Sequence, residues 1–146
     1  PRLHNLGNYI KWDYNKNVNL IKKELGWQSD ELEGVPDIAN PFSSKIECYM
    51  QGTRDYIKYL KRGYSRISQN MASELRNKNI SIEKARKLIQ SEGKVPPSLK
   101  IFLKFTNLKE KEFNNIVKES TVYPHKFKPS KVKAKKTSDF DQWYKE

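Results

Sequence analysis

The sequence predicts an all-α protein, a compact bundle of about five or six short helices with a basic, partly disordered C-terminal tail. Apolar residues recur at spacings of three and four in successive segments, and glycine, proline and serine separate these segments. No stretch alternates apolar and polar residues with a period of two. A length of 146 residues suits one domain, so we expect a helical domain over residues 1–123 and a tail over residues 124–146.

The first helix is predicted to begin at a cap provided by Asp13 or Asn15 and to run to about Leu25, before Gly26. Its expected inward positions are Val18, Ile21 and Leu25. Residues 28–45 follow, with two prolines, a glycine and the densest acids of the chain. This composition predicts an ordered loop.

The central helix is predicted within residues 45–66, KIECYMQGTRDYIKYLKRGYSR. Its apolar face consists of Ile46, Met50, Thr53, Ile57 and Leu60. Gly63 is placed to end the helix in a left-handed conformation. Six cations and four tyrosines are interleaved on the other faces, which indicates a second surface that faces an anion.

Four further helices are predicted in segments 67–77, 81–92, 95–105 and 109–117, the second of them capped by Ser81. Their expected core positions are Ile67, Met71 and Leu75; Ile82, Ala85, Leu88 and Ile89; Leu99, Phe102 and Leu103; and Phe113, Ile116 and Val117.

The composition changes at Pro124. Six lysines lie between residues 126 and 136 without an acid, a pattern typical of a mobile, solvated tail. The closing DFDQWYKE carries aromatic residues that we expect to dock on the domain or on a partner.

The charge balance indicates an anionic partner. The formal net charge is +12, which suits a phosphorylated metabolite, a nucleic acid or an acidic protein surface without choosing among them. A single cysteine excludes an internal disulfide and fits a reducing cytoplasm, the expected location. No apolar run approaches the roughly 18 residues of a membrane span, and no signal peptide is evident.

The sequence identifies no catalytic residue. His4 and His125 lie in different predicted loops without a thiol or carboxylate at ligand spacing, so we expect no metal site. The phosphate-binding and nucleophile motifs GxGxxG, GxxxxGK[ST] and GxSxG are absent.

Cations on the central helix are the candidate binding residues, namely Arg54, Lys58, Lys61 and Arg62. Guanidinium groups offer paired donors to phosphate or carboxylate, and ammonium groups add point charge. Arg66 and Arg76 bracket the next helix and are expected to join them. The alternative is that these charges only keep a helix soluble and internally paired.

Several blocks resemble the C-terminal portion of the N-acetyl sugar amidotransferases, in the ATP-pyrophosphatase (PP-loop) superfamily. They are LHNLGNYIKWD, IECYMQGTRDYIKYLKRGYSR, SELRN and EKARKLIQSEGKVPPSLKIFLKFTNLKEKEFNNI, and the resemblance spans about residues 3–119 in order. The MQGTRDYIKYLKRGY block is long and unusual, which makes it the most specific of them.

The resemblance implies a role in surface-polysaccharide sugar biosynthesis, where an acetamido group becomes an acetamidino group. ATP, with Mg²⁺ in the full enzyme, activates the amide oxygen by adenylation, and ammonia from a glutaminase partner then attacks. The four cations of the central helix suit the negative charge of pyrophosphate, a nucleotide-sugar or an acidic sugar. Glu74 and Arg76, in SELRN, match a family segment and are implied to contact substrate or to order the site.

Departures from the family pattern indicate either a C-terminal fragment of a larger enzyme or a diverged stand-alone remnant, and we favour the fragment. The family's SGGxDS loop and its cysteine-rich N-terminal element do not occur here. The chain alone is therefore expected to bind no ATP through that loop and to be inactive. Asn8 stands where the family tends to have an acid, and Lys109 replaces a capping threonine or serine, which predicts a cap weaker by up to about 1 kcal/mol.

Two other functions compete with this hypothesis. A basic helical module for nucleic acid is supported by the lysine tail and the interleaved tyrosines, although no helix-turn-helix or other nucleic-acid motif stands out. A module that docks the glutaminase partner is the other, with residues 126–136 as its electrostatic contact.

Overall fold

A computed structural model describes residues 2–27 and 50–134. Its elements, in chain order, are the 3-10 helix η1 (Leu6–Asn8), α1 (Tyr14–Leu25), α2 (Gln51–Arg62), α3 (Arg66–Arg76), α4 (Ile82–Ile89), α5 (Ser98–Thr106) and α6 (Glu110–Glu119). The described residues contain no strand, only one isolated bridge between Val95 and Lys133. The predicted all-α fold is confirmed. None of the helices in these two ranges has the length and apolar character needed to cross a membrane.

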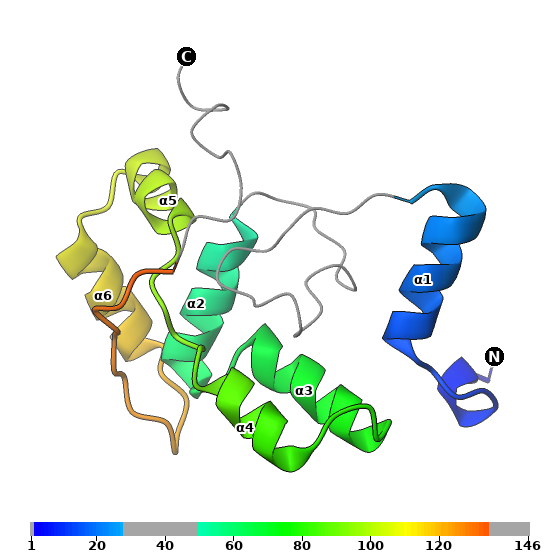
Figure 1. The fold of residues 1–146 in the computed structure, drawn as a ribbon. Helices are drawn as coiled ribbons and strands as arrows, with labels where there is room; N and C mark the ends of the chain where they lie inside the picture. Colours follow the sequence, from blue (N-terminus) through cyan, green and yellow to red (C-terminus); the bar gives the residue numbers. More distant parts are fainter. Residues whose placement is uncertain (1, 28–49, 135–146) are drawn as a thin grey trace.

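Helix α2 lies between two helix pairs (Figure 1). It packs against α5 and α6 on one side, while α3 and α4 pack against each other on the other side. Helix α1 lies at the far end from α5 and α6. The predicted loop 28–45 and the first residues of the predicted central helix, 45–49, lie outside the described residues.

Two apolar clusters form the core. The first joins α3 to α4 through Ile67, Met71 and Ala85. The second joins α2, α5 and α6, and its buried members are Tyr56, Leu60, Leu99, Phe113 and Val117. Most of these positions match the spacings of three and four in the sequence, because such spacings place side chains on one face of a helix.

Helix α2 ends at Gly63 as predicted, but it buries one tyrosine that was expected on its exposed surface. Gly63 has φ 78°, and its N–H donates to the Tyr59 carbonyl at 2.7 Å, which closes the helix. Tyr56, expected on the anion-facing surface, is buried in the second cluster. The reason is that α2 is contacted by both α5 and α6, so its buried face is wider than one row of residues.

Three residues predicted to face inward are exposed instead: Leu25, Ile82 and Ile116. Ile82 is the first residue of α4, and Leu25 is the last of α1, so each lies at a helix end. In α6 the buried face is the narrow row of Phe113 and Val117, and Ile116 lies beside it.

The start of α6 is better capped than the sequence suggests. The Lys109 N–H donates to Glu112 Oε2 at 2.7 Å, so the helix supplies one half of a capping box itself. The weakness predicted for this cap is therefore limited to the one hydrogen bond that a serine or threonine hydroxyl at position 109 would accept.

Residues 122–134, here called the strap, pack against the bundle. Val95 N–H donates to the Val132 carbonyl at 2.8 Å, and Ala134 N–H donates to the Val95 carbonyl at 2.9 Å. Phe127 packs on the second cluster. The expectation of a mobile, solvated tail is thus wrong for its first part, to Ala134, because backbone pairing and one aromatic anchor hold it while its lysines stay exposed. The predicted docking of the closing aromatic segment lies outside the described residues.

Tyr56 links this strap to α2. Its hydroxyl forms a hydrogen bond with the backbone of Ser130, and burial raises the pKa of Tyr56 above its ordinary value of 10.0. A raised pKa in the folded state means that the neutral phenol stabilises the fold fully below pH 10.0, and that this stability is lost as the pH rises through the folded-state pKa.

We therefore expect Tyr56→Phe to lower the free energy of unfolding by about 1 kcal/mol at pH 8, because one hydrogen bond is lost. Above pH 10 its stability should decline less steeply than that of the unmodified chain, since residue 56 no longer titrates. Urea unfolding at pH 8 to 11 measures both effects. Tyr123→Phe, at a 93% exposed position, is the matched control. If the free energies of unfolding of Tyr56→Phe and of the unmodified chain changed with pH in parallel, Tyr56 would not be the group whose titration destabilises the fold.

Two glycines with positive φ, Gly93 and Gly63, lie against the rings of Tyr59 and His125. The centroids of these two rings are 6.4 Å apart. Gly93 has φ 76°, and a Cβ atom there would overlap the Tyr59 ring. At Gly63 a Cβ atom would lie 2.7 Å from His125 Nδ1. Both positions thus require glycine for backbone conformation and for space.

Gly93→Ala should lower the free energy of unfolding by at least about 3 kcal/mol, since backbone strain and overlap with the ring add together. Gly26→Ala separates the two causes, because Gly26 has φ 61° and no atom within 4 Å of the added Cβ. That control should cost only about 1 kcal/mol. Equal losses, measured by denaturant unfolding, would show that the contact with Tyr59 contributes nothing.

Candidate functional site

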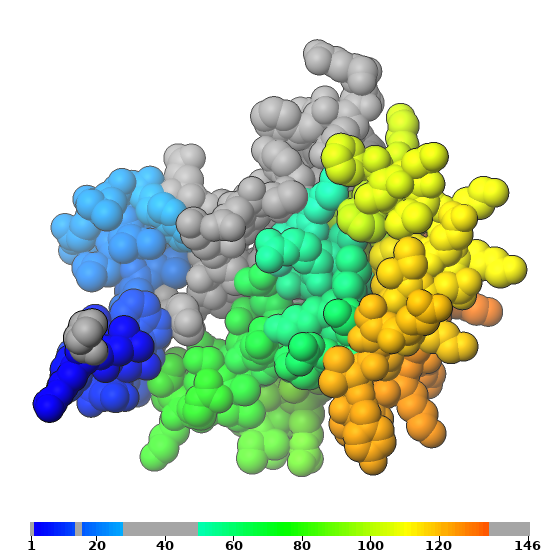
Figure 2. All heavy atoms as spheres, turned by 180° about the vertical axis from the view of Figure 1, so that it is seen from behind, coloured from blue at the N-terminus to red at the C-terminus, as the bar shows by residue number. Residues whose placement is uncertain are grey.

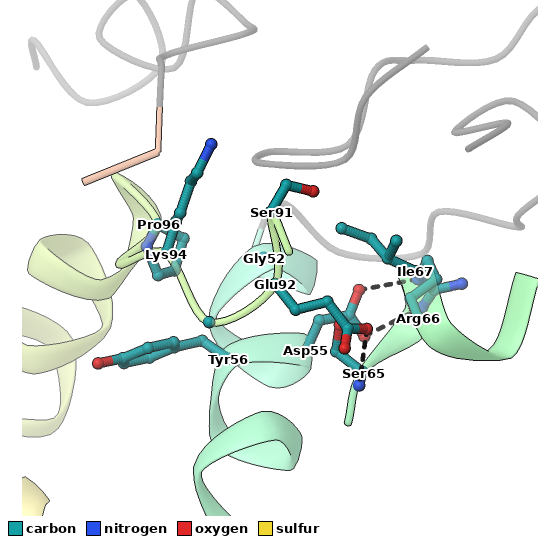
Figure 3. A pocket seen from close by; sticks show the side chains of 11 residues that line it. Gly52, Asp55, Tyr56, Ser65, Arg66, Ile67, Ser91, Glu92, Lys94 and Pro96 are labelled. Carbon is teal, nitrogen blue, oxygen red and sulfur yellow. Dashed lines mark hydrogen bonds and ion pairs between the residues drawn. The ribbon is translucent and has the colours of Figure 1, made fainter. Parts of the chain in front are cut away.

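A small pocket opens where the first turns of α2 and α3 meet the loop between α4 and α5 (Figure 3). Its lining residues are Gly52, Asp55, Tyr56, Ser65, Arg66, Ile67, Ser91, Glu92, Gly93, Lys94 and Pro96. The cavity volume is about 30 Å³, room for a water molecule rather than for a nucleotide or a sugar. A larger ligand must therefore bind across the surface around it.

The carboxylate of Glu92 is the most heavily bonded group at this pocket. Its Oε1 accepts from the Ser65 N–H at 3.0 Å, the Ser65 hydroxyl at 2.7 Å and the Ser68 N–H at 2.7 Å. Its Oε2 accepts from the Ser68 hydroxyl at 2.7 Å. Glu92 thus caps the start of α3 from another loop, where a carboxylate also meets the positive end of the helix dipole.

Asp55 and Arg66 form a half-buried ion pair beside this cap. Arg66 Nε donates to Asp55 Oδ2 at 2.8 Å and Arg66 Nη2 to Oδ1 at 3.4 Å, a two-point contact between α2 and α3. Gln51 Nε2 adds a bond to Asp55 Oδ1 at 3.2 Å. Arg66, predicted to bind an anionic ligand, is therefore already matched with a carboxylate of this chain.

Three other cations follow one line along α2: Arg54, Lys58 and Arg62. Arg54 Nη1 donates to Gln51 Oε1 at 3.3 Å, and Lys58 Nζ donates to Gln69 Oε1 at 2.7 Å. Lys58 Nζ also lies 5.2 Å from the ring centroid of Tyr64. Arg62 is exposed and has no hydrogen-bond or ionic partner within residues 2–27 and 50–134. We call these three residues the cation row.

Lys61 lies one turn after Lys58 in the same helix. It is half-buried, and its carbonyl accepts from the Val122 N–H at 2.9 Å, so it borders the strap. The backbone of Lys61 therefore borders the strap, while its spacing of seven from Arg54 and three from Lys58 keeps these three residues on one flank of α2.

Glu74 and Arg76 do not converge on a common point. Glu74 is buried in α3, and its Oε2 accepts from Asn79 Nδ2 at 3.0 Å. Arg76 is exposed in the last turn of the same helix. The position of Glu74 suits the ordering of the α3–α4 turn, and its role in substrate contact stays a prediction.

The described residues offer no candidate metal site, and their cations are groups that can bind an anion. Within the described ranges no group of three or more histidine, cysteine, aspartate or glutamate residues is placed to hold a metal ion. His4 Nδ1 bonds to the Tyr9 hydroxyl at 3.0 Å, and His125 packs on Gly63 with its Nε2 buried and unpartnered. Fixed cations on a helix can bind and orient an anion.

The sequence does not predict the role of Glu92 as a cap of α3. Its partners lie 24 and 27 positions away in the chain, and no short-range pattern connects SEG with GYSRIS. In the structure Ser65, the N-cap of α3, makes no side-chain bond to the helix, and its hydroxyl donates to Glu92 instead. A capping hydroxyl that is used as a donor requires an acceptor from elsewhere.

Residues 42–139 match the family model of the "LPS biosynthesis protein WbpG-like, C-terminal domain". The chain belongs to this family. Neither the comparison with curated proteins nor the comparison with solved structures gave a match.

The matched region of the WbpG-like C-terminal domain contains α2 to α6, the strap, the pocket and the cation row. Helix α1 precedes it. The family assignment agrees with the resemblance seen in the sequence and places the chain in lipopolysaccharide biosynthesis.

The Glu92 cap generates a specific expectation. Glu92→Gln keeps the size but loses the negative charge and one acceptor oxygen, so the free energy of unfolding should fall by about 1 to 3 kcal/mol. Glu24→Gln is the control, because Glu24 is exposed and its contact with Lys23 at 3.5 Å is a surface pair. Denaturant unfolding of both variants is the measurement. A Glu92→Gln chain as stable as the control would refute the capping role.

Proposed function

We propose that this WbpG-like domain is the C-terminal helical part of an ATP-dependent N-acetyl sugar amidotransferase. In this proposal it completes the substrate side of an active site whose ATP-binding loop is supplied elsewhere in the enzyme. ATP and Mg²⁺ would activate the acetamido oxygen of the sugar, and a glutaminase partner would deliver the ammonia. The family assignment and the cation row support the proposal.

The observation that carries the proposal is that Arg66 has a carboxylate partner within the chain, whereas the cation row has none among the described residues. Arg66 is neutralised by Asp55 at 2.8 Å. The partners of Arg54 and Lys58 among the described residues are all neutral: the amide of Gln51 for Arg54, and the amide of Gln69 and the ring of Tyr64 for Lys58. Amides orient these side chains without cancelling their charge, so the positive potential stays available to a ligand.

The dimensions of the row indicate the kind of anion. Three residues spaced by four along a helix extend over about 12 Å. This length suits an extended anion, such as the diphosphate of a nucleotide-sugar together with its sugar, better than a single phosphate. The role proposed for the row is to bind and orient this substrate, while the chemistry of adenylation occurs on groups outside the chain.

Charge reversal at Arg62 tests the proposal in the complete enzyme. Arg62→Glu should lower kcat/KM for amidation by about 10- to 100-fold, mostly through KM, because one charge-assisted contact to substrate becomes a repulsion. Arg62 is the best position, since no intramolecular contact described here is lost with it.

Lys84→Glu, an exposed lysine on α4, is the matched control and should leave kcat/KM unchanged. Arg54→Glu should behave like Arg62→Glu, with circular dichroism showing an intact helical fold. Unchanged turnover in both row variants would return these cations to the role of keeping α2 soluble.

A further inference from the structure

Helices α5 and α6 and the strap together form one end of the molecule, away from α1 (Figure 1). Seen from behind, they cover one continuous flank (Figure 2). The cation row lies on α2, so it belongs to a different element from those of this end. We call the surface of residues 98–134 the lysine end.

The lysine end is strongly basic, and its excess of positive charge lies on α5 and the strap, because all of its acids belong to α6. Its nine lysines are all exposed: Lys100, Lys104, Lys109, Lys111, Lys118, Lys126, Lys128, Lys131 and Lys133. Only three acids oppose them, Glu110, Glu112 and Glu119, and residues 98–134 contain no arginine. Lysine is a compact point charge, whereas arginine gives two-point contacts to single phosphates. Such a surface favours a partner with spread negative charge over one bound phosphate.

Large apolar side chains are exposed on the same elements. Tyr123 is 93% exposed and Phe105 is 81% exposed. Ile116, Val122 and Val132 are also exposed. They come from α5, α6 and the strap, so every element of the lysine end contributes at least one.

The combination discriminates between kinds of anionic partner. Nucleic-acid surfaces use lysine or arginine for the phosphates and aromatic rings for stacking, whereas exposed aliphatic side chains such as Ile116, Val122 and Val132 gain little there. At the surface of an anionic bilayer, lysines are attracted to the headgroups while tyrosine, phenylalanine and aliphatic side chains enter the interface. Both features of the lysine end are then used.

We propose that the lysine end binds peripherally to the surface of an anionic lipid bilayer. The strap contributes four of the nine lysines of this surface. Its backbone is held by Val95 and by Phe127 in the second cluster, so its four exposed lysines are presented by an ordered segment rather than by a free coil. An ordered segment loses less conformational entropy on binding.

Co-sedimentation of the full 146-residue chain with lipid vesicles tests the proposal. Vesicles of phosphatidylcholine with about one third phosphatidylglycerol should bind the chain, and pure phosphatidylcholine should not. The fraction of chain bound to the vesicles should fall steeply as NaCl is raised from about 0.05 to about 0.5 M, because added salt screens the attraction between lysines and headgroups.

Two variants locate the surface. The quadruple variant in which Lys126, Lys128, Lys131 and Lys133 become Gln should lower the partition coefficient by well over tenfold, at roughly fivefold per lysine. The control replaces four exposed lysines elsewhere by Gln: Lys11, Lys16, Lys84 and Lys87. The partition coefficient of this control should fall much less, because its four lysines lie outside the lysine end.

The apolar contribution is tested separately. Tyr123→Ser combined with Phe105→Ser should lower binding several-fold at constant charge, whereas Leu20→Ser with Leu25→Ser, at exposed positions of α1, should not. Equal loss in the two quadruple lysine variants would overturn the proposal. So would release of the chain from vesicles by a random oligonucleotide at equal phosphate concentration, which would assign the lysine end to nucleic acid.

Discussion

The two apolar clusters of the domain share no buried residue, and polar contacts join them. Glu92 connects the α4–α5 loop to the start of α3, and Asp55 connects α2 to Arg66 of α3. Tyr59, in the second cluster, lies against Gly93 of the same loop. Each half of the bundle can pack within itself by the hydrophobic effect, but their relative position depends on these directional bonds. The pocket lies at this junction.

The block that identifies the family is mostly structural. In MQGTRDYIKYLKRGY, Thr53 bonds through its hydroxyl to Ser98 at 2.8 Å, Tyr56 and Leu60 are buried, and Gly63 ends the helix. The residues that are not used in this way are the cations at every fourth position. This block therefore combines the packing of α2 with a row of cations that have no carboxylate partner among the described residues.

The strap shows how composition misleads about order. A lysine-rich segment without acids resembles a solvated coil, because lysine is rarely buried. Here the lysines do stay exposed, and the order comes from the backbone pairing at Val95, the aromatic ring of Phe127 and the small side chain of Ala134. These few contacts are long-range, so their effect on the segment does not show in a local count of charges.

The sequence by itself determined the helical class, the end of α2 at Gly63, and the buried positions Leu60, Met71, Ala85, Leu99 and Phe113, because these follow from periodicity and from local backbone conformation. It also determined that cations line α2. Only the tertiary structure decided that Arg66 has a carboxylate partner while Arg54, Lys58 and Arg62 have none among the described residues, that Tyr56 is buried, and that Glu92 caps α3. Those outcomes depend on which residues far apart in the chain come within hydrogen-bonding distance, and that is set by the packing of whole helices.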